Sequence, residues 1–180
     1  GDALSEHLPN TLFVAPDAPW KCSVSPSGFQ WFPIPWLDGS SETEAAEKLA
    51  LVSNELDTWI DRTLEKESVM PKNAILFGFS QGTMLSLHIG PRRQSSFGGI
   101  IGCSGKIIDI DFLRRNLNSR PPVLLIHGEN DDVVDPSFFH EASRELESLE
   151  FDVKKHMSPG IGHGISSDGL RVALDFLVNL

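Results

Sequence analysis

Residues 74–89 constrain the fold of this chain more than any other part of its sequence. An apolar run, Ala74–Phe77, leads into the pentapeptide GFSQG at residues 78–82, and a helical pattern follows directly. In such a strand–turn–helix context, the Gly-x-Ser-x-Gly pattern lifts a serine hydroxyl above the edge of a sheet. The flanking glycines remove side chains that would collide in the sharp turn. The segment therefore predicts a nucleophilic serine, Ser80.

Two later residues supply the other groups that a catalytic serine needs. A serine hydroxyl is a poor nucleophile at neutral pH, and His163, in the glycine-rich loop at residues 158–164, is the best candidate for the base. The imidazole in turn needs an anion at its second nitrogen, to hold its tautomer and stabilise the imidazolium. Asp131 follows an apolar run and is the preferred acid, but spacing alone does not separate it from Asp132.

Other histidines and acids near these positions fit structural roles better. His127 ends an apolar run, where we expect it to shape the loop that bears the acid. Asp135 precedes Pro136 and is expected to cap the helix that follows. The remaining histidines lie in the N-terminal segment, on helices or in a strand: His7, His88, His140 and His156.

An acyl-transfer site also needs hydrogen-bond donors for the oxyanion. The backbone N–H of Gln81, at the start of the helix after the serine, is one candidate. A second donor normally comes from a glycine-rich loop after an earlier strand. The sequence shows no such loop after an earlier strand, because its His-Gly pairs, at residues 127–128 and 163–164, already belong to the strand before the acid and to the loop that carries His163.

Short apolar runs alternate with helical patterns along the chain, which predicts an open, mostly parallel α/β sheet with helices on both faces. The expected buried strands are Thr11–Ala15, Ala74–Phe79, Gly99–Cys103 and Val123–His127, with a more polar strand near the sheet edge at Val153–Met157. The expected helices run from Ser40/Ser41 to Lys66, from Gln81 to Gly90, from Pro136 to Leu149 and from Ser167 to the C-terminus.

The proline-rich stretch Pro16–Gly39 does not fit this alternation. It is too rich in proline for a helix and too long for a turn, and it carries three of the tryptophans. Long ordered loops in compact domains are often functional. Either its own aromatic side chains simply anchor this loop, or Trp31 and Phe32 form an apolar wall above Ser80, where an acyl chain could lie.

Composition excludes several classes of function. With 180 residues, 40% of them hydrophobic, the chain is expected to form one domain over residues 1–180. Its net charge of -10 argues against nucleic acid and anionic membrane surfaces as partners. No stretch approaches the ~20 apolar residues of a membrane span. Cys103 is expected to be a buried free thiol, which suits a reducing compartment and predicts a cytoplasmic protein.

The combination of motifs resembles the carboxylesterase/phospholipase family of α/β-hydrolases, which includes the acyl-protein thioesterases. The resemblance covers nearly the whole chain and rests on residues 12–19, 30–32, 78–82 and 99–105, on His127-Gly128 with Asp131 and Val134, and on Gly162-His163. It implies an α/β-hydrolase fold with Ser80, Asp131 and His163 as the triad, and it favours Asp131 over Asp132. It also implies hydrolysis of carboxylic esters and thioesters without a cofactor.

The chain departs from the family pattern in two places. Thr83 stands where many members carry another glycine. Family members also begin with a strand ending in His-Gly-x-Gly, which supplies the second oxyanion donor, whereas Gly1–Leu4 resembles only the end of that loop and the start of the following helix. We therefore expect a sheet that lacks this N-terminal strand and its oxyanion loop, in a chain that is a piece of a longer protein.

Two functions from different classes remain after this reading. The leading hypothesis is a serine hydrolase that acts on small-molecule or acyl esters and thioesters. The alternative is a non-catalytic, α/β-hydrolase-like binding protein that lacks a complete oxyanion hole. A metal-dependent hydrolase is disfavoured because the histidines and carboxylates show no ligand spacing, so no metal site is expected. The sequence leaves the oligomeric state undecided between a monomer and a homo-oligomer.

Overall fold

The computed structural model describes residues 2–22, 25 and 27–180. They form two compact units, one made of residues 2–9 and 64–180 and the other of the described residues between 10 and 63. The expectation of a single domain over residues 1–180 stays a prediction.

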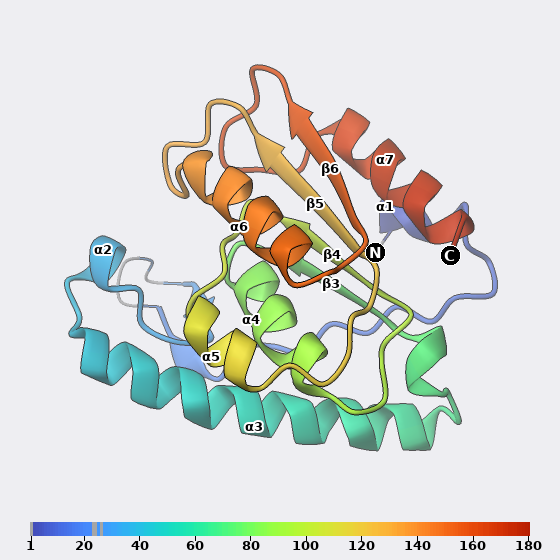
Figure 1. The fold of residues 1–180 in the computed structure, drawn as a ribbon, viewed down its shortest axis with the longest axis horizontal. Coiled ribbons are helices and arrows are strands. Elements are labelled where there is room, and N and C mark those ends of the chain that lie inside the picture. The colour runs from blue at the N-terminus through green and yellow to red at the C-terminus, as the bar shows by residue number, and fades with distance from the viewer. Residues whose placement is uncertain (1, 23–24, 26) are drawn as a thin grey trace. The chain divides into compact units, whose positions relative to one another are not determined.

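The larger unit is built on a parallel sheet of four strands in the order β3-β4-β5-β6 (Figure 1). The strands are β3 (Ile75–Phe79), β4 (Gly99–Cys103), β5 (Val123–Gly128) and β6 (Val153–Ser158). They confirm the predicted strands after residue 70, including the edge position of the last one. The register pairs Phe79 with Cys103 and Gly128 with Ser158, so the carboxyl ends of the strands lie at one edge of the sheet.

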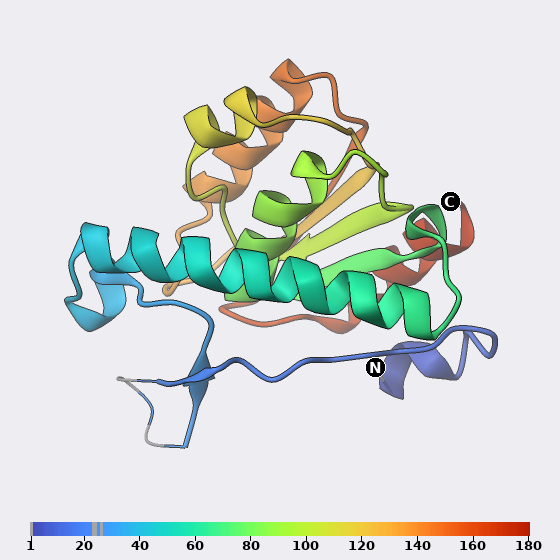
Figure 2. The same ribbon diagram turned by 90° about the horizontal axis from the view of Figure 1, so that it is seen from below.

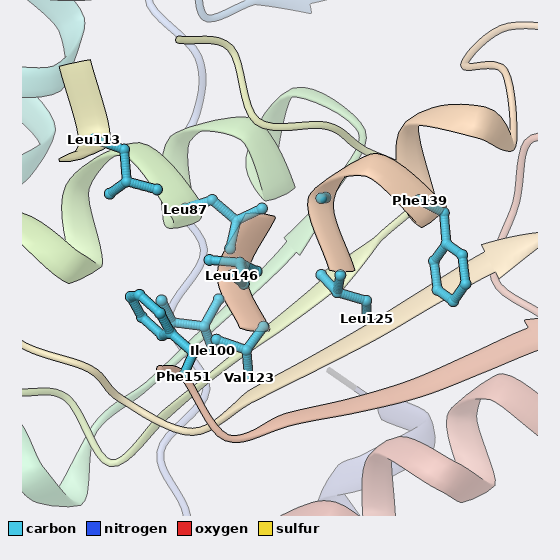
Figure 3. Packing of buried hydrophobic residues seen from close by; sticks show 9 residues of the cluster. Leu87, Ile100, Leu113, Val123, Leu125, Phe139, Leu146 and Phe151 are labelled. Atoms are coloured by element: carbon cyan, nitrogen blue, oxygen red, sulfur yellow. The ribbon is translucent and has the colours of Figure 1, made fainter. Parts of the chain in front are cut away.

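Helices cover both faces of this sheet, as predicted. One face packs against α4 (Gln81–Ile89), α5 (Ile110–Arg115) and α6 (Ser137–Ser148), and the other packs against α7 (Ser167–Val178) (Figures 1 and 2). Neighbouring strand residues point to opposite faces, so Leu125 joins the first cluster and Leu124 the second. The first cluster is drawn in Figure 3 and comprises Leu87, Ile100, Leu113, Val123, Leu125, Phe139, Ala142, Leu146 and Phe151.

The ends of these helices follow their capping residues. Ser166 accepts a hydrogen bond from the Gly169 N–H at the start of α7. Asp135 receives the Ser137 N–H at 2.8 Å, but α6 begins one residue later than expected, so Pro136 and not Asp135 occupies the N-cap position. A short helix, α1 (Asp2–Ser5), contacts α7 and corresponds to the helix start expected near Leu4, whereas Gly1 lies outside the described residues.

The smaller unit contains a short antiparallel hairpin and the long helix α3 (Glu42–Lys66). The hairpin pairs β1 (Trp20–Lys21) with β2 (Phe29–Gln30), and the Lys48 ammonium of α3 lies 4.9 Å from the centroid of the Trp20 ring. The helix begins as predicted, with the Ser41 hydroxyl accepting the Glu44 N–H. None of the helices in the described ranges is long and apolar enough to cross a membrane.

Two predictions for the N-terminal half are wrong. Residues 11–15 form no strand, and Leu12 is 60% exposed, because an apolar run becomes a strand only when a neighbouring strand supplies hydrogen-bond partners. The proline-rich stretch is not a continuous loop, since it contains the hairpin and α2 (Pro35–Asp38). Proline is compatible with the first turn of a helix, where its missing N–H removes no intrahelical bond.

His88, near the end of α4, adds a pH-sensitive element to the larger unit. Its ring stacks on Phe112 of α5 with centroids 5.0 Å apart and planes 11° from parallel. Burial lowers the pKa of His88 to about 4, and the positive charge of Arg92 acts in the same direction, while Asp109 opposes both. The folded protein therefore keeps His88 neutral at a pH where an unfolded chain would protonate it.

We expect the free energy of unfolding to fall as the pH drops from 6.5 to 4. In this range His88 binds a proton in the unfolded state but not in the folded state. The lowered pKa of His88 corresponds to roughly 3 kcal/mol of folding stability lost over this pH range. His88→Gln should flatten this dependence, measured by urea unfolding at several pH values, and His140→Gln, on the exposed side of α6, is the control. Equal slopes for His88→Gln and the wild type would assign the effect to another group.

Candidate active site

Ser80 occupies a strained turn between β3 and α4. Its backbone has φ 53° and ψ −114°, a conformation that non-glycine residues rarely adopt. The turn is so tight that a Cβ on Gly78 would lie 2.2 Å from the carbonyl carbon of Gly82. The Ser80 hydroxyl makes no capping hydrogen bond to α4. Its side chain is therefore not used to start the helix.

Asp131 lies just beyond the end of β5, in a turn that directs hydrogen-bond donors onto its carboxylate. The N–H groups of Val133 and Val134 donate to its Oδ1 at 3.0 and 2.9 Å. Burial acts to raise the pKa of Asp131, but the bonds from Val134, His163 and Val133 together outweigh it and hold this pKa below the usual value. Asp131 is thus a buried carboxylate that remains ionised, whereas Asp132 beside it is exposed.

His163 lies between Asp131 and the turn that carries Ser80. Its Nδ1 is 2.8 Å from Asp131 Oδ2 and 3.1 Å from Oδ1. A nitrogen that faces a carboxylate carries the proton, so this contact selects the Nδ1–H tautomer and leaves Nε2 as the basic nitrogen. The imidazole packs against the ring of Phe79, with centroids 4.8 Å apart. Because Phe79 directly precedes Ser80, this contact places the serine turn beside His163.

The loop that carries His163 is fastened to the carboxyl ends of β5 and β6. The Asn130 N–H donates to the Ile161 carbonyl at 2.8 Å, and the Glu129 carboxylate accepts the Gly160 N–H at 3.0 Å. Gly128 allows this approach, because a Cβ there would lie 2.2 Å from the Gly162 carbonyl oxygen. The loops bearing the acid and the histidine are therefore positioned as one assembly.

His127 also holds the loop that carries Asp131. Its buried Nε2 lies 2.9 Å from the Val134 carbonyl oxygen and 3.3 Å from Asp131 Oδ2. A contact with a carbonyl oxygen requires Nε2 to donate, so the ring bonds the turn that follows Asp131 and presents a polar hydrogen toward the carboxylate. This placement agrees with the expectation that His127 shapes the loop bearing the acid.

The expected site residues fall into two groups. Ser80, Gln81, Asp131 and His163 meet at the carboxyl edge of the sheet, and the Gln81 N–H lies in the first turn of α4, where the helix dipole favours negative charge. Trp31 and Phe32 belong to the smaller unit, so their place in an acyl site stays a prediction.

Sequence reasoning missed two contacts of this site. The ring of Phe79 on His163 joins residues that are far apart in the chain. The Thr83 hydroxyl bonds the ends of β3 and β4, although the sequence marks Thr83 only as a departure from glycine. The one signal for both was their position within or beside the GFSQG turn.

Cys103 does not offer a competing nucleophile. Cys103 is a buried free thiol, as predicted, and burial raises its pKa to about 12, so it stays protonated. The described residues contain no group of three or more His, Cys, Asp or Glu side chains that could hold a metal ion.

Comparison with known proteins settles the family. A family model described as Phospholipase/Carboxylesterase matches residues 2–180. The chain belongs to this family. The solved structure of esterase PE8 resembles it with a TM-score of 0.92 and 36% identity, covering 99% of this chain and 82% of that one. The structure of Arabidopsis thaliana SOBER1, with a TM-score of 0.81 and 22% identity over 97% of this chain and 86% of that one, shows the same fold.

The relatives of this family member include thioesterases. Acyl-protein thioesterase 1 homolog 1 of Dictyostelium discoideum is 28% identical over 170 residues, which is 92% of this chain and 75% of that protein. Acyl-protein thioesterase 1 of Saccharomyces cerevisiae is 27% identical over 181 residues, or 93% of this chain and 77% of that protein. The chain is therefore an enzyme of the serine hydrolase class.

Gly128→Ala should lower kcat/KM for a nitrophenyl ester by about tenfold to a hundredfold, because small displacements of catalytic groups cost this much. The new methyl group would meet the carbonyl oxygens of Gly162 and Ile161, and the backbone next to His163 would have to move. Gly164→Ala is the matched control, since a Cβ there meets nothing within 4 Å. Unchanged kinetics in Gly128→Ala would contradict the close approach of the two loops.

Proposed function

We propose that this enzyme hydrolyses carboxylic esters or acyl thioesters through an acyl-enzyme formed on Ser80. One observation carries the proposal. The same imidazole, that of His163, contacts the Asp131 carboxylate at 2.8 Å and packs against Phe79, the residue before Ser80. An acid, a base and a serine in this order and arrangement constitute the machinery of nucleophilic acyl transfer.

The reaction begins with attack of Ser80 Oγ on the substrate carbonyl carbon while His163 Nε2 takes the hydroxyl proton. Asp131 holds the Nδ1–H of the imidazole and stabilises the imidazolium that forms. The oxyanion accepts a hydrogen bond from the Gln81 N–H at the start of α4. The imidazolium then protonates the departing alkoxide or thiolate, and the tetrahedral intermediate collapses to the acyl-enzyme.

A water molecule then hydrolyses the acyl-enzyme, again with His163 as the base. His163 Nε2 takes a proton from the water as its oxygen attacks the acyl carbon, and the proton then passes to Ser80 Oγ as the ester bond breaks. The products are the carboxylic acid and the free serine. No step draws on a metal ion or an organic cofactor.

The similarity to named thioesterases and esterases supports a proposal for the substrate class. Proteins named acyl-protein thioesterase match most of this chain, and esterase PE8 shares its fold at 36% identity. We therefore place acyl esters and acyl thioesters among the substrates, with Trp31 and Phe32 as candidates for the wall that contacts the acyl chain. The acidic net charge of -10 supports small-molecule or acylated substrates over nucleic acid. A cytoplasmic location is part of the same proposal.

The experiment that tests the function measures hydrolysis of nitrophenyl esters from acetate to palmitate and of the matching acyl thioesters. We expect the wild type to turn over both classes and Ser80→Ala to lose turnover. Asp131→Asn should lower kcat by roughly 10⁴, because the wrong imidazole tautomer is then favoured. Asp132→Asn, which changes an exposed neighbour in the same turn, is the matched control and should retain wild-type kcat.

Two results would contradict the proposal. Equal kcat losses in Asp131→Asn and Asp132→Asn would remove the basis for assigning the acid. Stoichiometric ester binding without turnover by a folded wild type would favour the second candidate function, a binding protein that lacks a complete oxyanion hole.

A further inference from the structure

We propose that Thr83 is a positioning residue that holds Ser80 in its strained backbone conformation. The inference rests on the proposed role of Ser80 as the nucleophile, and it concerns a residue outside the Ser80, Asp131 and His163 triad. Thr83 lies in the first turn of α4 and is only 1% exposed. Its side chain faces the ends of both strands that flank the turn.

The hydroxyl of Thr83 joins three segments at one point. Its Oγ1 lies 2.7 Å from the carbonyl oxygen of Cys103, the last residue of β4, and 3.0 Å from that of Gly78 in β3. The Ser80 N–H donates to the same Cys103 oxygen at 2.8 Å. Both lone pairs of this carbonyl are thus used, one by the backbone of Ser80 and the other by Thr83.

These contacts lie next to Ser80, whose strained backbone conformation must be held by neighbouring groups. A non-glycine residue at φ 53° and ψ −114° persists only where the surrounding structure holds it there. The Thr83 hydroxyl carries one hydrogen, which it shares between the Cys103 carbonyl that receives the Ser80 N–H, at 2.7 Å, and the Gly78 carbonyl two residues before Ser80, at 3.0 Å. Thr83 therefore limits the backbone rotations that would relax the turn and move Oγ away from His163.

The hydrogen bonding of the Thr83 hydroxyl differs from that of most hydroxyl side chains in helices. Such side chains commonly bond the carbonyl one turn earlier in their own helix. Ser86, one turn further along α4, does this, with its Oγ 2.8 Å from the Gly82 carbonyl oxygen. The Thr83 hydroxyl instead shares its one hydrogen between two carbonyls that lie outside α4, so it stabilises the turn and not the helix.

The surroundings of Thr83 are also shaped to admit its methyl group. A Cβ on Gly102 would lie 2.6 Å from Thr83 Cγ2, and a Cβ on Gly105 would lie 2.4 Å from Thr83 Cβ. Glycine at these two positions therefore leaves the space that threonine fills. Glycine at position 83 would leave this space empty and would remove the hydroxyl that bonds both strands.

The test compares Thr83→Val, Thr83→Ser and Ser86→Ala with the wild type. The measurements are kcat and KM for a nitrophenyl ester, the second-order rate of labelling by a fluorophosphonate, and the melting temperature. Thr83→Val keeps the shape but loses the hydroxyl, and we expect kcat and the labelling rate to fall about tenfold with KM nearly unchanged, because the nucleophile is misplaced. Thr83→Ser keeps the hydroxyl and should restore both rates to within about threefold of the wild type.

Ser86→Ala is the matched control, because it removes a buried hydroxyl from the same helix whose bond stays within α4 and reaches neither β3 nor β4. It should leave kcat and the labelling rate unchanged even if its melting temperature falls. Wild-type rates in Thr83→Val, or an equal loss of rate in Ser86→Ala, would overturn the inference. If Ser80→Ala retained turnover, the proposed function itself would fail; if it lost turnover while Thr83→Val kept it, only the role of Thr83 would fail.

A second set of variants tests the contact without removing the hydroxyl. Gly102→Ala would bring a methyl group against Thr83 Cγ2, and we expect it to lower kcat and the labelling rate. Adding Thr83→Ser removes Cγ2, so the double variant should recover most of the loss. Equal losses in Gly102→Ala and the double variant would contradict the packing that places Thr83 against the turn.

Discussion

The backbone conformation of Ser80 is the constraint on which the rest of the site depends. At φ 53° and ψ −114°, the chain passes from β3 into α4 within a single residue. The chain can make this turn because Gly78 carries no side chain. A Cβ at position 78 would overlap the backbone of Gly82. The Cys103 carbonyl then holds the Ser80 N–H, so the strained residue is fastened to the end of β4.

The acid and the base are positioned by a different part of the same sheet. The ladder between β5 and β6 ends at the pair Gly128 and Ser158, and the loops that follow bond one another directly. Asp131 receives two backbone N–H groups and His163, which keeps its pKa low despite burial. The contact between Phe79 and His163 joins this assembly to the serine turn. The parallel register of four strands thus brings together three loops that are distant in the sequence.

Much of this arrangement could be predicted from the sequence, for physical reasons. Strands buried on both faces, β4 and β5, appear as apolar runs. The apolar run at β3 was recognised in the same way, and β6 was predicted as a more polar strand near the sheet edge. The run at residues 11–15 is similarly apolar but forms no strand. Strand pairing needs a neighbouring strand, and the hydrophobicity of a segment does not show whether one is present. The helix α5 (Ile110–Arg115) was missed because it is short, although Asp109 accepts the Phe112 N–H and offered a capping signal.

The details of the site depend on side-chain directions that spacing cannot give. Asp131 and Asp132 are adjacent and chemically alike, and only the turn through Val133 and Val134 buries the first and exposes the second. The prediction that Trp31 and Phe32 line an acyl site likewise depends on side-chain directions that the sequence does not give. Thr83 was noticed only as a change from glycine, because its bonds reach residues five and twenty positions away.

If the strained turn presents Ser80 as the nucleophile, an electrophilic probe should react at this residue, and mass spectrometry can locate the adduct. The folded enzyme is treated with one equivalent of a fluorophosphonate, digested, and mapped for the phosphonylated residue. We expect a single adduct on Ser80, with none formed in Ser80→Ala. A stoichiometric adduct on another serine, or equal labelling of Ser80→Ala, would contradict it.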